Sequence, residues 1–506
     1  MRAIASSGLS GLQVLVMAIL LSGGNVAPAQ NINGTPIRMD VGPTGALPAN
    51  PWACGSHHSA AVVGGRAMSS DGEYVLIEAR CPLDPTDTNG LADLYIFSRT
   101  LGTTELITRA WHGGPTTGSV NNATISGDGR YVAYQSSAPD ILPPGVPHGL
   151  LYLLDRATGL TVPIDVTSTG AAPIPLPGGA SGGGGPHISA DGAYVVYFTT
   201  TPNLFPPNNP PIQWGYLRWS RLTGQTELVN YAVDGSTVPS PGGFNCIHTI
   251  SADGGRVLFC GQGFEYVPLP LGAPGARHVL MRDMIAGTTT LINTDQDGIL
   301  STAASPYLRH TLSDDGLKVF LAGGQWPSVP ESLNHPLWAY EKDLATGGIR
   351  PIGLGAPNTA GTPAPPFAHS SGRDIVLITP QIYGIVPGTS PFEPVAVFAR
   401  TGRAFRPAEW GDGTPMVQTP PFIPQMGTSG AQVAAISDDG RWAMITAGLA
   451  EFGTYLVSLP IADPVTEGYS ATYPAPFLNI RYPEGGLSVA YARWCPPSQP
   501  GYLAMT

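Results

Sequence analysis

The chain carries little charge and almost no lysine. Charged residues make up 12% of its 506 residues, only Lys318 and Lys342 are lysines, and the formal net charge is −11. Nucleic-acid binding depends on dense cationic contacts to phosphate, and the sequence has no basic run. The composition therefore argues against a nucleic-acid partner, and it disfavours long solvent-facing helices, which need a charged face.

Several signatures of other protein classes are also missing. After the N-terminal leader no stretch reaches the ~18 apolar residues that a membrane-spanning helix needs. There is no Cys-x-x-Cys motif and no Gly-x-Ser-x-Gly nucleophile elbow, and the glycine run 182–185 is not followed by the Lys-Ser/Thr of a phosphate loop. We therefore favour a non-enzyme, and we expect no catalytic residues, no bound metal and no cofactor.

The first 29 residues have the pattern of a secretory signal peptide. Arg2 provides the positive start, the segment 9–21 is mostly apolar, and Ala27-Pro28-Ala29 fits a small-x-small cleavage site. The pattern predicts cleavage near Ala29 and a periplasmic or secreted mature protein.

The composition favours an all-β fold. Glycine (65) and proline (53) are abundant, yet hydrophobic residues still make up 42% of the chain. This combination is typical of many short strands that are joined by Gly/Pro-rich turns.

A repeated unit runs through nearly the whole chain. It consists of an apolar residue, Ser-x-Asp-Gly and a β-rich run, and six copies place the serine at Ser69, Ser126, Ser189, Ser251, Ser313 and Ser437. A degenerate seventh copy ends at Gly372, and the spacings between equivalent positions are 57, 63, 62, 62, 56 and 68 residues. Seven units at such a period predict a closed repeat architecture.

Ser-x-Asp-Gly suits a type I turn that ends in a left-handed glycine, which predicts a three-residue hairpin loop at each motif. A second hairpin follows in each unit, for example around Gly159 and Gly224. Four antiparallel strands per unit define a propeller blade. We predict a seven-bladed β-propeller over residues 30–462, with a strand-containing C-terminal extension over 463–506.

The repeat resembles a known family. Ser-x-Asp-Gly-x-Tyr-Val, followed by a Leu-Tyr-(Ile/Leu)-x-x-Arg strand and a Thr-Gly turn, is similar to the WD40-like propeller repeats of the TolB type over roughly residues 37–460. The resemblance implies the fold; propellers of this kind include interaction modules, peptidase lids and polysaccharide-degrading enzymes.

The segment 37–41 precedes the first motif, where the fourth strand of a blade would lie. We predict that it pairs with the last blade and closes the ring, which removes two sheet edges. Strand-like runs in the tail, such as 478–481, compete for this role.

Five cysteines in an exported protein predict disulfides with one cysteine left over. A three-residue loop over 252–254 sets Cys246 opposite Cys260, and Cys54 and Cys81 flank the first hairpin. We predict these two disulfides, and Cys495 is unassigned.

The long connections of each unit emerge on one face of a propeller, and functional residues concentrate on such loops. Loop aromatics there are interpreted either as stacking platforms for a ligand or as packing for the loops; those chosen as binding candidates are Trp111, Trp214, Phe264, Trp326 and Trp410.

His248 and His310 occupy equivalent repeat positions. They either form ordinary hydrogen bonds or contribute to a metal or acid–base site. Asp87-Thr88-Asn89-Gly90 is interpreted as a solvated Asx turn rather than as a calcium loop.

Two functions follow. The preferred hypothesis is an exported, monomeric, non-catalytic module that binds an envelope protein, peptide or glycan through the long-loop face. The alternative is a polysaccharide lyase or hydrolase that uses the channel histidines with a divalent metal.

Overall fold

The structure is a computed structural model, and it describes part of the chain. The described residues are 37–47, 58–59, 65–167, 169–174, 185–205, 212, 215–238, 248–268, 277–301, 309–322, 326–328, 339–353, 367–370, 375–379, 395–398, 404–405, 432–439, 441–448, 452–458, 461–463, 468–469, 478–481, 488–492 and 502–505. The predicted signal peptide lies outside these ranges.

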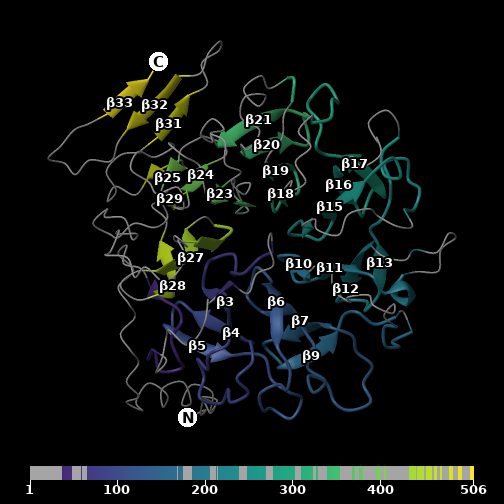
Figure 1. Cartoon of the computed structure of the whole chain (residues 1–506), viewed down its shortest axis with the longest axis vertical. Coiled ribbons are helices and arrows are strands. Elements are labelled where there is room, and N and C mark those ends of the chain that lie inside the picture. Colours follow the sequence, from purple (N-terminus) through teal and green to yellow (C-terminus); the bar gives the residue numbers. More distant parts are fainter. Residues whose placement is uncertain are drawn as a thin grey trace, which may run out of the picture.

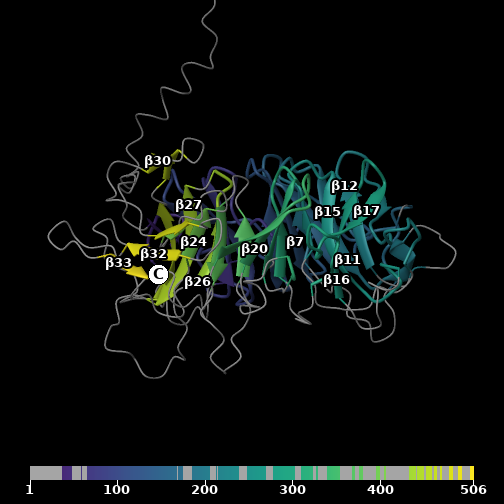
Figure 2. The same ribbon diagram turned by 90° about the horizontal axis from the view of Figure 1, so that it is seen from above.

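The protein is a β-propeller. The described strands include seven four-stranded antiparallel sheets, which are arranged around a common centre and form one layer when seen edge-on (Figures 1 and 2). In chain order we number them sheets 1 to 7. Within each of sheets 1 to 6 the strands pair in the order of the sequence, as expected for propeller blades.

The first three sheets contain the following strands. Sheet 1 consists of β2 (His58–Ser59), β3 (Tyr74–Ala79), β4 (Asp93–Ser98) and β5 (Thr103–Leu106). Sheet 2 consists of β6 (Val120–Ile125), β7 (Tyr131–Ser136), β8 (Leu151–Asp155) and β9 (Leu160–Pro163). Sheet 3 consists of β10 (His187–Ile188), β11 (Tyr194–Thr199), β12 (Gly215–Ser220) and β13 (Thr226–Leu228), with the 3-10 turn η2 (Pro202–Leu204) between β11 and β12.

Sheets 4 to 6 repeat this pattern. Sheet 4 consists of β14 (Thr249–Ile250), β15 (Arg256–Gln262), β16 (Arg277–Asp283) and β17 (Thr288–Leu291). Sheet 5 consists of β18 (Arg309–Leu312), β19 (Lys318–Ala322), β20 (Ala339–Asp343) and β21 (Ile349–Gly353). Sheet 6 consists of β22 (Phe367–Ser370), β23 (Ile375–Thr379), β24 (Val395–Phe398) and β25 (Ala404–Phe405).

Sheet 7 combines the two ends of the repeat region. Its strands are β26 (Gln432–Ile436), β27 (Trp442–Gly448), β28 (Phe452–Ser458) and the N-terminal β1 (Ile37–Arg38). Ile37 lies opposite Leu456 and Arg38 opposite Tyr455, and the Met39 N–H donates to the Thr454 carbonyl at 2.8 Å. The predicted closing strand is therefore confirmed.

The remaining strands lie in the C-terminal extension. β29 (Ile461–Asp463) pairs with β30 (Gly468–Tyr469), and a separate sheet contains β31 (Leu478–Arg481), β32 (Ser488–Ala492) and β33 (Tyr502–Met505). β31 contacts β25 at the edge of the ring (Figure 1).

The hydrophobic core is divided into clusters between neighbouring sheets. One cluster joins sheets 7 and 1 through residues such as Met39, Val75 and Leu456, and further clusters join sheets 1 and 2, 2 and 3, and 3 and 4. The second strands of sheets 1 to 3 are buried along most of their length, which explains continuous β-branched and aromatic runs such as β11 (YVVYFT). Burial between sheets is therefore what holds the ring together.

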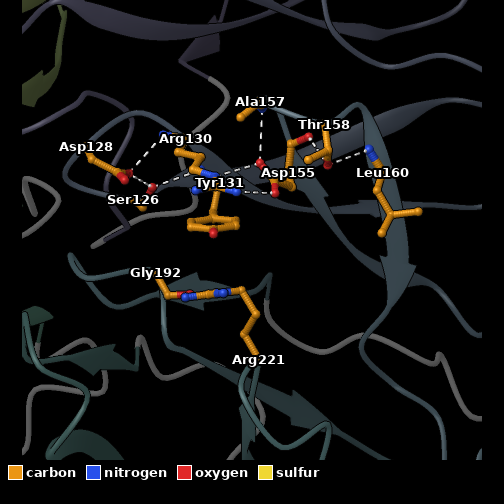
Figure 3. A network of polar contacts seen from close by, with 10 residues as sticks. All are labelled: Ser126, Asp128, Arg130, Tyr131, Asp155, Ala157, Thr158, Leu160, Gly192 and Arg221. Atoms are coloured by element: carbon orange, nitrogen blue, oxygen red, sulfur yellow. Dashed lines mark hydrogen bonds and ion pairs between the residues drawn. The ribbon is translucent and has the colours of Figure 1, made fainter.

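The Ser-x-Asp-Gly motifs form the hairpins between first and second strands. In sheet 2, Ser126 Oγ donates to Asp128 Oδ1 at 2.5 Å, while Asp128 Oδ1 accepts the Arg130 N–H and Ser126 Oγ accepts the Tyr131 N–H, each at 2.9 Å (Figure 3). Corresponding bonds recur in the other described motifs, for example Ser251 with Asp253 and Ser437 with Asp439. The two side chains satisfy the backbone of the turn, as expected for Ser and Asp at such positions.

The predicted three-residue loop is wrong by one residue. The Ser251 N–H donates to the Arg256 carbonyl and Ile250 lies opposite Val257, so the loop has four residues, 252–255. Because Asp253 Oδ1 accepts the Gly255 N–H at 2.9 Å, the residue after the motif glycine stays in the loop. The register therefore no longer sets Cys246 directly opposite Cys260.

The two disulfides stay predictions. Cys54 and Cys246 lie outside the described residues, as does Cys495. Cys81 and Cys260 are both buried, at the edge of sheet 1 and within β15.

The motif glycines of sheets 1 to 5 also mark contacts between sheets. Tyr131 of sheet 2 packs against Gly192 of sheet 3, and a Cβ on Gly192 would lie 2.5 Å from the Tyr131 ring. The guanidinium of Arg221 lies 4.2 Å from the centre of the same ring, and Arg221 Nε donates to the Gly192 carbonyl at 2.8 Å (Figure 3). The ring, the cation and the peptide group thus form a three-part stack that joins two sheets.

The stack recurs at two further junctions, between sheets 1 and 2 and between sheets 7 and 1. Arg156 lies over Tyr74 and donates to the Gly129 carbonyl, and Arg99 lies over Trp442 and donates to the Gly72 carbonyl. Trp442 belongs to sheet 7 and Gly72 to sheet 1. The same interaction therefore also joins the last sheet to the first.

The end of the channel at these turns is crossed by an arginine. Arg66 of sheet 1 donates to Asp314 of sheet 5 at 3.0 Å and to Asp438 of sheet 7. The space lined by these residues and by the described inner strands has a volume of about 50 Å³. A water molecule takes about 30 Å³, so the space between these residues has room for one or two water molecules.

We predict that Gly192→Ala destabilises the protein far more than Gly159→Ala. Both glycines have left-handed backbones (φ +67° and +70°), but a Cβ on Gly159 would meet no atom within 4 Å. The backbone strain of about 1 kcal/mol is common to both, and steric overlap with Tyr131 adds about 1–3 kcal/mol only at Gly192. Denaturant unfolding measures the difference, and equal losses would contradict the stacking arrangement.

Candidate functional site

The long connections of neighbouring sheets are bonded to one another on one face, which we call the long-loop face. It comprises the loops between second and third strands and the connections between sheets. Asp140 accepts the Trp111 N–H with its carbonyl and the Thr117 N–H with its carboxylate. The Val233 N–H donates to the Tyr266 carbonyl in the same way. The described loops therefore form a connected surface.

Two of the predicted aromatic residues are exposed on this face. Trp111 is 53% exposed and Phe264 is 59% exposed. Exposed aromatic side chains of this size are characteristic anchors of binding surfaces. Trp214 and Trp410 lie outside the described residues.

Trp326 does not belong to this surface. Its side chain is fully buried, its ring meets that of Tyr340 edge-to-face at 4.8 Å, and its Nε1 donates to the Asn293 carbonyl at 3.3 Å. Of the two interpretations of the loop aromatics, packing is the correct one for Trp326. The apolar surface of its indole is buried, and its N–H finds a hydrogen-bond acceptor inside the protein.

The histidines of the inner strands are buried rather than displayed at a channel mouth. His248 is 2% and His310 is 1% exposed. The His248 ring lies 4.5 Å from that of His187, and its Nε2 is 3.1 Å from the Gly185 carbonyl. Burial lowers the pKa of His248 to about 4, so this residue is neutral at physiological pH.

The described residues contain no group of three or more His, Cys, Asp or Glu side chains that could hold a metal. In the loop that resembles part of a calcium site, Asp87 Oδ1 accepts the Asn89 N–H at 3.3 Å and Asp87 Oδ2 accepts the Tyr95 hydroxyl. Asp93 accepts the Asn89 side-chain amide at 2.7 Å. The loop contains the expected Asx turn, but the turn is not solvated as predicted, because Asp87 and Asp93 are buried and accept hydrogen bonds from protein donors.

Residues that the sequence analysis did not select form a strained polar cluster between sheets 1 and 2, at the long-loop end of their strands. Asn122 has φ +52°, the one positive value among the described non-glycine residues, and the register shifts between Asn121 and Thr124. Asn121 Oδ1 is buried without a hydrogen-bond partner. Bulges and strained residues of this kind concentrate at functional sites.

Glu78 completes this cluster. Burial raises its pKa from 4.5 to about 7, against the opposing effects of Arg80 and of the Asn122 N–H. A carboxyl group that exchanges its proton near neutral pH can donate or accept a hydrogen bond. The Asn121-Asn122 pair within a predicted strand was the signal in the sequence, because asparagine tolerates a left-handed backbone better than other non-glycine residues.

No family model matches the sequence, and no curated protein matches it. Solved structures with a similar fold include an oligogalacturonate lyase in complex with manganese, at 14% identity over 80% of this chain and 90% of that one, with a TM-score of 0.47. An oligogalacturonate lyase from Vibrio parahaemolyticus is 11% identical over 80% of this chain and 92% of that one, with a TM-score of 0.47. TolB from Acinetobacter baumannii is 14% identical over 67% of this chain and 62% of that one, with a TM-score of 0.35.

These structures include TolB, whose repeat type the sequence resembles. The assignment of the propeller fold itself rests on the strand pairing described above.

We predict that Glu78→Gln becomes more stable relative to the wild type as the pH rises. The folded-state pKa lies above the unfolded one, so folding favours the protonated form and stability is lost as the pH rises from 4.5 to 7. The relative gain of E78Q between pH 4.5 and 8 is up to about 3 kcal/mol at 1.36 kcal/mol per pKa unit. Urea unfolding at both pH values measures it.

Glu105→Gln is the matched control, because Glu105 is exposed on β5. E105Q removes the same charge from the protein surface and so measures the effect of the change in net charge alone. A pH-independent difference between E78Q and the wild type would contradict the proposed burial of Glu78.

Proposed function

We propose that the protein is an exported, non-catalytic binding propeller that holds a protein, peptide or glycan of the cell envelope on its long-loop face. The observation that carries this proposal is the connected set of loops that exposes Trp111 and Phe264. Loops that are already bonded to one another lose little freedom on binding, which favours affinity.

The opposite face supports the choice of surface. There the connections are short hairpin turns, and Arg66 together with Asp314 and Asp438 fills the channel end. A ligand approaching from that side meets tightly packed turns. The long-loop face instead offers exposed aromatic anchors and, between sheets 1 and 2, the polar cluster of Glu78, Asn121 and Asn122.

The alternative, a lyase or hydrolase that uses the channel histidines, rests on His248 and His310. Both side chains are buried. A substrate would have to reach them, and the described residues around them leave no access. We therefore retain the binding function as the proposal and treat turnover of a polysaccharide as an outcome that would contradict it.

The proposed location follows from the N-terminal sequence. The segment 1–29 has the features of a signal peptide, and none of the described residues forms a helix with the length and apolarity to cross a membrane. We propose a periplasmic or secreted protein that acts as a monomer.

We predict that the double variant Trp111→Ala/Phe264→Ala loses its envelope ligand. Truncating an anchor residue typically costs about 2 kcal/mol or more, so ligand capture from an envelope extract should fall at least tenfold. Quantitative mass spectrometry and glycan analysis of the captured material measure it.

The control is Leu222→Ala/Ile285→Ala. These side chains are 71% and 85% exposed, but they lie in the short turns between third and fourth strands on the opposite face. Equal losses in both double variants, or capture unchanged in the first, would contradict the assignment of the binding surface.

A further inference from the structure

A cavity lies between sheets 2 and 3 on the long-loop side. It is lined by His148, Leu151, Asp165, Pro173, Tyr197 and Phe198, among others, and has a volume of about 220 Å³. At about 30 Å³ per water molecule it has room for roughly seven waters, which is enough for a small organic group but not for a polymer.

Asp165 is the charged residue of this cavity. The residue is 7% exposed, its Oδ1 accepts the Leu151 N–H at 3.0 Å and its Oδ2 accepts the Leu150 N–H at 2.8 Å. Burial raises its pKa from 3.8 to about 6. Because this value is still below neutral pH, the carboxylate is mostly ionised at pH 7.5.

The repeats show that a charge is not needed at this position. In sheets 1, 3 and 4 the corresponding backbone N–H of the third strand is accepted by the residue fourteen positions later, which is Thr108, Asn230 or Asn293. Neutral side chains therefore stabilise the strand in three other sheets. Sheet 2 alone among these four has a carboxylate, which costs desolvation energy that an amide or a hydroxyl avoids.

The described residues provide no Lys or Arg ion pair for Asp165. The titratable groups that face it are His148, Tyr152 and Tyr197, and His148 Nδ1 lies 2.8 Å from the Tyr152 hydroxyl. The nearby sequence segments 175–184 and 206–214 contain no lysine or arginine. Buried charges in proteins are normally paired.

We propose that this cavity binds a small organic cation, a primary ammonium or guanidinium group, with Asp165 as its counter-ion. Leu151, Pro173 and Phe198 would cover the apolar stem of such a group. The Tyr197 side chain lines the same cavity. The site is independent of the proposed function, since it would bind a cation whether or not the loop surface holds a macromolecule.

The cation can come from a free amine or from a lysine or arginine side chain of a polypeptide. Isothermal titration calorimetry at pH 7.5 with n-butylamine, methylguanidine and the peptide Gly-Gly-Lys-Gly-Gly distinguishes these sources, with n-butanol as the neutral probe. We expect the cations to bind and n-butanol not to bind. Peptide affinity at least tenfold above that of butylamine identifies a polypeptide source, and equal or lower affinity identifies a free amine.

Asp165→Asn should weaken cation binding at least tenfold. Its matched control is Asp234→Asn, which removes the same charge from an exposed position after β13 and should leave binding unchanged. Asparagine occupies the equivalent position in sheets 3 and 4, and a thermal melt verifies that the variant is folded.

Two further measurements keep the proposal falsifiable if Asp165→Asn does not fold. Pro173→Trp should block the cavity while leaving the carboxylate in place, and wild-type affinity should fall about tenfold per pH unit below pH 6 as the carboxyl becomes protonated. Absence of binding by every cation at millimolar concentration, equal affinity of Asp165→Asn and the wild type, or equal binding of n-butanol would overturn the proposal.

Discussion

Apolar burial between neighbouring sheets is reinforced by one repeated interaction, the stack of an aromatic ring, an arginine and a motif glycine, at the junctions of sheets 7 and 1, 1 and 2, and 2 and 3. The glycine is needed twice, because its backbone is left-handed and because the ring of the preceding sheet occupies the space of a Cβ. The arginine then satisfies the glycine carbonyl while its face lies on the ring. Trp442 and Gly72 form the same contact between sheets 7 and 1. This contact and the pairing of β1 with β28 together close the ring.

This arrangement divides the molecule into two functional halves. The turn face is tightly packed, and backbone hydrogen bonds pass from motif to motif, for example from the Ser70 N–H to the Gly127 carbonyl and from the Gly127 N–H to the Ala190 carbonyl. The long-loop face does not contain these motif-to-motif hydrogen bonds. It carries the exposed aromatics, the strained Asn122 and three carboxyl groups, Glu78, Asp93 and Asp165, whose pKa values burial raises.

The sequence analysis was successful where an interaction is local and repeated. The Ser-x-Asp-Gly turns, the four-stranded sheets and the closing strand over residues 37–38 all follow from spacing and turn chemistry. It failed at the loop length, because the hydrogen bond from the Gly255 N–H to Asp253 depends on geometry that residue types alone do not specify. It also failed at Trp326, since exposure of a loop aromatic depends on residues far away in the chain, here Tyr340 and Asn293.

The sites between sheets could be predicted only in part. Comparison of the repeats could have identified Asp165 as a carboxyl group where the other sheets have Thr or Asn. Nothing in the sequence placed His148 and Tyr197 beside it, because sheets 2 and 3 contribute them separately. Glu78 and Asn122 also belong to different sheets. Their contact could therefore be found only in the three-dimensional structure.

Native-state hydrogen exchange tests most directly whether the motif contacts join the sheets into one rigid platform. Our account predicts that the amides of Ser70, Gly127 and Ala252, which donate to the neighbouring motif, open with the same free energy as the central strands of their sheets. Exchange of these amides at widely different rates from sheet to sheet, well before the strands open, would contradict it.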